Sequence, residues 1–171
     1  MKNWKKIVRL LLMIVLSSTA SICFAQPTDT LPPDPGSISV FTVQDLSFGA
    51  FTQGTSGGTV IISNEGVRSV TGTVVALNFG VSYYQSIFDI DAPEGTIISI
   101  MNGPDVELTG SNGGTMNLEL GPSSPASPFA TVVQQPLRTQ VSIGGTLTVG
   151  NSTAAPPGVY TGEFYVTFNQ E

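Results

Sequence analysis

Apolar and polar residues alternate along short stretches of the chain after residue 36, with a period of two instead of the 3.6 of a helix. Each stretch is rich in Val, Ile, Thr, Phe or Tyr and is bounded by Gly, Pro, Asn or Asp. This pattern predicts antiparallel strands joined by turns. The expected strands lie within residues 37–51, 57–63, 67–77, 86–90, 96–101, 105–109, 115–120, 128–133, 137–144, 145–151 and 158–171.

Asn-Glu-Gly at 64–66 has the composition of a hairpin loop, and the turn-rich stretches Asp-Ala-Pro-Glu-Gly at 91–95 and Gly-Ser-Asn-Gly-Gly at 110–114 each connect two expected strands. The triplet Gly-Gly-Thr occurs at Gly57, Gly113 and Gly144. Each triplet is expected to form a tight turn followed by the first residue of a strand, because glycine tolerates a positive φ. The unequal spacing of the three triplets argues against a repeat protein.

The last stretch, residues 158–171, alternates without interruption. Its core-facing residues would be the even-numbered Tyr160, Gly162, Phe164, Val166 and Phe168. We therefore expect this segment to be an internal strand of the fold.

Strands with one apolar face cannot fold alone, since each sheet would leave that face in water. Two sheets packed face to face bury both apolar surfaces. The sequence therefore predicts an all-β, immunoglobulin-like antiparallel β-sandwich over residues 37–171. A small barrel is the alternative, because periodicity alone does not distinguish the two architectures.

Residues 1–25 have the layout of a secretory signal peptide, with a basic start, an apolar run from Leu10 to Leu16 and small residues before a cleavage site after Ala25. The run is too short to span a bilayer easily. A lipoprotein acylated at Cys23 is less favoured, because the bulky Ile22 precedes the cysteine. Residues 26–36 form a Pro-rich leader.

Cleavage would leave 146 of the 171 residues, one domain by size, with two arginines against twelve acidic residues and a net charge of −10. Such a surface repels nucleic acid and anionic lipid. The mature chain would contain no cysteine and no histidine, which excludes disulfides, His or Cys zinc ligands and His-based catalytic pairs. We expect a periplasmic, extracellular or cell-surface protein without a membrane span after cleavage.

Three groups of residues are weighed as sites. Asp89, Asp91 and Glu94 could bind calcium or act as a glycosidase pair, but the alternation of 88–91 favours a solvent-facing strand end. Arg68 and Arg138 could each pair with a carboxylate on a neighbouring strand.

The aromatic residues at 79, 83, 84 and 88 could form a sugar-binding face, although core packing is favoured. No residue is predicted to be catalytic, to bind a cofactor or to ligate a metal.

The stretches 45–51, 59–73, 87–101 and 144–169 follow one another in an order that resembles a bacterial family, the domain of unknown function 4402. The most specific parts are the opening at 46–49 and the closing motifs at 144–147 and 158–162. The resemblance covers residues 37–170. It implies an exported β-sandwich that is not an enzyme and that is distantly similar to spore coat protein U and to chaperone-usher pilin subunits.

The pilin similarity implies assembly by β-strand exchange, in which a strand of one subunit fills a groove of the next. Gln170 stands where such pilins usually carry tyrosine, and the usual disulfide is impossible here. We therefore expect an exported structural or adhesive surface protein whose partners are itself or related subunits. The alternative is a monomeric secreted binding module, for example one for a surface glycan.

Overall fold

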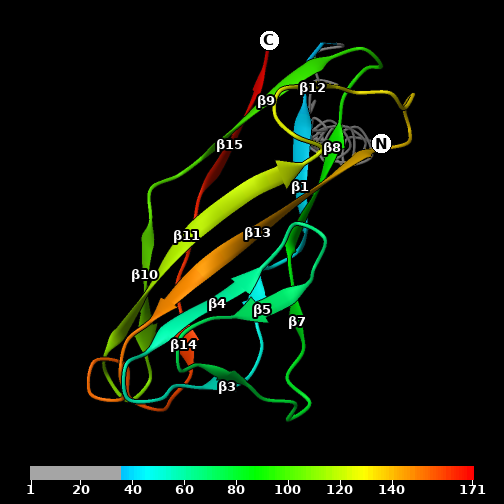
Figure 1. The fold of residues 1–171 in the computed structure, drawn as a ribbon. Helices are drawn as coiled ribbons and strands as arrows, with labels where there is room; N and C mark the ends of the chain where they lie inside the picture. Colours follow the sequence, from blue (N-terminus) through cyan, green and yellow to red (C-terminus); the bar gives the residue numbers. More distant parts are fainter. Residues whose placement is uncertain (1–35) are drawn as a thin grey trace, which may run out of the picture. The chain divides into compact units, whose positions relative to one another are not determined.

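The computed structural model describes residues 36–171, which contain no helix and hence no helix able to cross a membrane (Figure 1). The expected signal peptide at 1–25 and the leader up to residue 35 lie outside the described residues. The described part forms fifteen strands: β1 (Ser39–Gln44), β2 (Ser47–Phe48), β3 (Phe51–Thr52), β4 (Gly58–Ile62), β5 (Arg68–Val70), β6 (Val75–Ala76), β7 (Tyr83–Tyr84), β8 (Ser86–Asp91), β9 (Ile97–Asn102), β10 (Val106–Gly110), β11 (Thr115–Ser124), β12 (Phe129–Ala130), β13 (Thr139–Val149), β14 (Tyr160–Thr161) and β15 (Val166–Gln170).

Eight strands make the main sheet, in the order β1-β8-β13-β11-β10-β14, with β4 beside β13 and β5 beside β4. The pairings are antiparallel. The central strand β13 pairs with β11 along one edge. Along its other edge, Thr139–Ile143 pair with β8 and Gly145–Val149 pair with β4, so β13 changes partner at Gly144.

A glycine is required at position 144 because the backbone there lies very close to the backbone of residues 62–64. A Cβ atom there would lie 2.0 Å from the Ile62 carbonyl oxygen, closer than any real contact. The expectation of a tight turn at this Gly-Gly-Thr triplet is therefore wrong, because the glycine sits within a strand where two neighbours meet. The other two triplets do contain left-handed glycines, with φ of 71° at Gly57 and 85° at Gly113.

The second layer consists of the three-stranded sheet β12-β9-β15 and the two-stranded ladders β2-β7 and β3-β6. Strands β9, β12 and β15 form a first hydrophobic cluster with β8 and β13. Its buried members are Phe88, Ile90, Ala92, Ile98, Val141 and Ile143. The buried members of the second cluster are Phe48, Val60, Ile62, Val74, Leu108, Met116, Leu118, Leu147, Val149 and Ala155. Leu120 and Phe164 pack against both clusters.

The predicted all-β antiparallel sandwich is thus confirmed, as are the β4–β5 and β10–β11 hairpins. The stretches 137–144 and 145–151 join into the single strand β13. The expected continuous closing strand is wrong: β14 pairs with β10 in the main sheet, whereas β15 pairs with β9 in the second layer. Strand β15 lies at the edge of its sheet and is not internal. Val166 and Phe168 are half-buried and their neighbours Thr167 and Asn169 are exposed, so the predicted faces of these residues are correct.

An apolar groove as the candidate functional site

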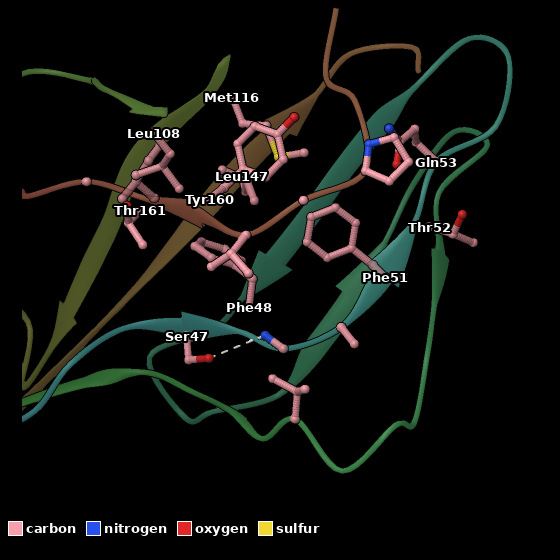
Figure 2. A pocket seen from close by; sticks show the side chains of 18 of the residues that line it. Ser47, Phe48, Phe51, Thr52, Gln53, Leu108, Met116, Leu147, Tyr160 and Thr161 are labelled. Atoms are coloured by element: carbon pink, nitrogen blue, oxygen red, sulfur yellow. Dashed lines mark hydrogen bonds between the residues drawn. The ribbon is translucent and has the colours of Figure 1, made fainter. Parts of the chain in front are cut away.

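A groove of about 590 Å³ lies between two stretches of chain that run over the second cluster (Figure 2). One wall is residues 46–53, which include β2 and β3, and the other is residues 156–162, which include β14, together with Phe164. The floor comes from the main sheet and consists of Leu108, Met116, Leu118 and Leu147. These four side chains are at most 8% exposed, so the groove reaches down to the core.

The walls add aromatic rings. Phe48 and Phe51 project from β2 and β3 toward the stretch that carries Tyr160 (Figure 2). Phe164 continues the opposite wall toward β15. None of the lining residues carries a charge. The groove is therefore suited to an uncharged, apolar occupant.

Three polar side chains of the walls donate hydrogen bonds within the protein. The Ser47 hydroxyl donates to the Ser82 carbonyl at 2.9 Å, and the Tyr160 hydroxyl donates to the Pro156 carbonyl at 2.6 Å. The Gln53 side-chain amide donates to the Ala155 carbonyl and so ties one wall to the chain that leads into the other. What remains for an occupant is mainly apolar surface.

Arg68 holds the first wall in place. Its Nη1 donates to the carbonyls of Phe48 at 3.3 Å and Ala50 at 3.2 Å, and its Nη2 donates to Leu77 at 3.3 Å. The guanidinium also lies 4.2 Å from the centre of the Tyr83 ring, a cation–π contact. All three carbonyls belong to groove-lining residues, so one side chain fixes the wall segment and the β6–β7 connection.

The backbone of this wall is shaped to receive the guanidinium. Gly49 has a φ of 69°, and a Cβ atom there would lie 2.8 Å from Arg68 Nη1. Any larger residue would combine an unfavourable backbone conformation with a clash. The expectation that Arg68 pairs with a carboxylate is replaced by a pairing with main-chain carbonyls.

Exposed apolar side chains line the rim. Phe79 is 75% exposed and Val81 is 56% exposed on the β6–β7 connection, while Val159 on the opposite side is 69% exposed. Isolated exposed apolar residues are normal on protein surfaces, but a cluster around an apolar groove marks an interaction site. The groove and its rim are therefore the candidate functional site.

The aromatic residues singled out from the sequence separate in the structure. Phe88 is buried in the first cluster, whereas Tyr83 is 43% exposed and Tyr84 is 36% exposed. Core packing is correct for Phe88 and wrong for Phe79, Tyr83 and Tyr84. These four rings do not share one face, because only Phe79 lines the groove and Arg68 covers Tyr83.

The carboxylates at the end of β8 are each engaged separately. Asp91 accepts a hydrogen bond of 2.7 Å from the Gln135 amide and lies 3.9 Å from Arg138, so Arg138 pairs with a carboxylate on a neighbouring strand, as predicted. Glu94 accepts from Gln134 at 2.8 Å. Phe88 and Ile90 face the core, so the solvent-facing interpretation of Asp89 and Asp91 is confirmed. Among residues 36–171 no three His, Cys, Asp or Glu side chains gather as metal ligands.

The groove itself was missed by the sequence analysis. Its walls come from segments more than 100 residues apart, 46–53 and 156–162 with Phe164, and alternation along a strand does not reveal which strands will meet. The available signals were the paired phenylalanines in Ser47–Phe51 and the phenylalanine beside glycine at 79–80. In each of these two stretches a phenylalanine precedes a left-handed glycine: Phe48 precedes Gly49, and Phe79 precedes Gly80.

The protein is therefore an antiparallel all-β domain with an open apolar groove above its second cluster. The chain belongs to the family described as "Domain of unknown function (DUF4402)", whose model matches residues 38–169. No curated protein and no solved structure matches the chain significantly.

Proposed function

We propose that this protein is an exported structural or adhesive surface protein whose copies associate by strand addition. In this proposal an extended apolar segment of one copy lies in the groove of another. The main observation behind this proposal is the uncharged groove, whose floor consists of the core residues Leu108, Met116, Leu118 and Leu147. An inserted strand would complete the layer over the second cluster and cover the exposed rim side chains of Phe79, Val81 and Val159.

Further features support association over catalysis. Within residues 36–171, strand β15 ends its sheet and pairs along one edge only, and an unpaired strand edge is a template for another strand. The expected signal peptide at 1–25 agrees with work outside the cytoplasm. Tyr160 is the one titratable side chain among the residues that line the groove, so the lining contains no acid–base pair.

Association is tested by replacing a rim residue. The exported protein is expected to form concentration-dependent oligomers in analytical ultracentrifugation. Phe79→Asp should weaken this association about tenfold or more, because it removes a large apolar contact and places a charge at the rim. The matched control Val67→Asp introduces the same charge at a 61% exposed position outside the groove and should change little. A wild-type protein that stays monomeric at every concentration would refute the proposal.

The alternative function is a monomeric binding module for a surface glycan. It is favoured by the exposed rings of Phe79 and Tyr84, since exposed aromatic side chains stack on sugars. A glycan array separates the two proposals. A module predicts saturable glycan binding by a monomer that is lost in Tyr84→Ala, whereas strand addition predicts no dependence on Tyr84.

A further inference from the structure

Strand β1 is one of the end strands of the main sheet. Among the described residues it pairs with β8 alone. Four of its six residues are exposed, including three apolar ones, Val40 at 38%, Phe41 at 42% and Val43 at 56%. Ile38, just before the strand, packs partly against the first cluster. The strand therefore leaves much of its apolar surface in water.

A single arginine fastens the outer face of β1. The Arg138 guanidinium lies 4.0 Å from the centre of the Phe41 ring and 3.9 Å from Asp91 on β8. The Arg138 side chain is 41% exposed and that of Asp91 is 30% exposed, so water competes for both contacts. We call this arrangement of Phe41, Arg138 and Asp91 the β1 latch.

The segment that contains β1 matches the groove chemically. Residues 37–44 carry no charge, and the groove lining carries none. The segment is eight residues long, as is the wall at 46–53. Ile38 and Val40 lie on one face of the extended segment and Phe41 and Val43 on the other, so either face can offer two apolar side chains to the groove floor while the main chain pairs with a wall.

Other segments of the chain fit less well. The leader 26–36 contains four prolines, which lack the N–H that a ladder needs, and two aspartates. Strand β15 is engaged in the core, where Phe168 packs on Phe88 with ring centres 5.4 Å apart. Removing β15 would take Val166 and Phe168 from the first cluster, whereas releasing residues 37–44 takes only Ile38 from it and exposes one edge of β8.

We infer that residues 37–44 of one copy leave β8 and occupy the groove of a second copy, and that the β1 latch controls this release. This inference rests on the proposed function and names its donor segment. Assembly then requires a strand that the monomer keeps in place, so the latch sets how readily copies associate.

The donor is tested by disulfide trapping. The expected mature chain suits this method because it has no cysteine of its own: the one cysteine of the sequence, Cys23, lies in the expected signal peptide. Val43→Cys and Thr52→Cys, the latter on the groove wall, are made in separate full chains, exported, purified and mixed under mild oxidation. A Val43–Thr52 cross-linked heterodimer is expected on a non-reducing gel. The control pairs Val43→Cys with Val67→Cys, which is exposed and outside the groove, and should give far less product.

The latch is tested with Arg138→Ala. Loss of the ring contact and the ion pair should raise the rate of association about threefold. Gln170→Glu changes the net charge by the same amount at an exposed site on β15 and should not raise it. An equal rate in both variants would refute the latch.

The outcomes separate the two levels of the argument. Oligomers that form without the cross-link refute residues 37–44 as donor and leave the proposed function intact. Absence of oligomers and of cross-links at every concentration refutes both.

Discussion

At the scale of single residues, the groove depends on one guanidinium. Arg68 is one of two cations expected in the mature chain, and it binds three main-chain carbonyls instead of an acid. Arginine suits this position because its planar fork donates in several fixed directions while its face stacks on Tyr83. A charge surrounded by carbonyl oxygens needs no carboxylate partner.

Arg68→Met should lower the free energy of unfolding by about 2 kcal/mol, since charged hydrogen bonds to three carbonyls are lost at a half-exposed site. Arg68→Lys should recover only part of this, because an ammonium cannot donate in the same fork and loses the ring stack. Urea denaturation of the three proteins checks the order. Equal stability of the Met and Lys variants would show that the fork geometry is unimportant.

At the scale of elements, β13 organises the main sheet. Its core-facing residues Val141 and Ile143 belong to the first cluster, and Leu147 and Val149 belong to the second. One strand thus carries both clusters on one face, and the change of partner at Gly144 lets two shorter strands share its edge. Closing strand β15 covers only the first cluster, which leaves the second to be covered by short ladders.

The faces of β15 predict unequal responses to the same substitution. Val166→Asp should cost about 3 kcal/mol or more, because it removes apolar contacts with the first cluster and places a carboxylate among them. Thr167→Asp, on the exposed face, should cost about 0.5 kcal/mol. Thermal unfolding followed by circular dichroism measures both. If the two variants lose stability equally, the assigned faces of this strand are incorrect.

The sequence predicts the features that depend on neighbouring residues, such as the faces of strands, and misses those that depend on pairing between distant strands. The alternating faces of β8 and β15 and the two hairpins follow from neighbours in the chain. The separation of β8 and β9 into different layers depends on which strands pair across the fold. The groove depends on the same pairing of distant strands. The partners of Arg68 could not be predicted either, because they are main-chain carbonyls, which every residue has and which no sequence motif marks.

At the scale of the whole molecule, the two clusters form one connected core in the described chain. Leu120 and Phe164 pack against both, and β13 runs beneath both. Phe164 also lines the groove. Phe164 therefore connects the groove lining with the first cluster, to which β9 and β15 contribute.

This connection predicts cooperative unfolding. Calorimetry of the exported protein should show a single transition whose calorimetric and van't Hoff enthalpies agree. Phe164→Ala should lower the free energy of unfolding by about 2–3 kcal/mol and keep a single transition, since a shared residue loosens both clusters together. Met116→Ala, confined to the second cluster, is the matched comparison. Two separate transitions in the Phe164 variant would mean that the clusters unfold independently. In that case an occupant of the groove would stabilise only the second cluster.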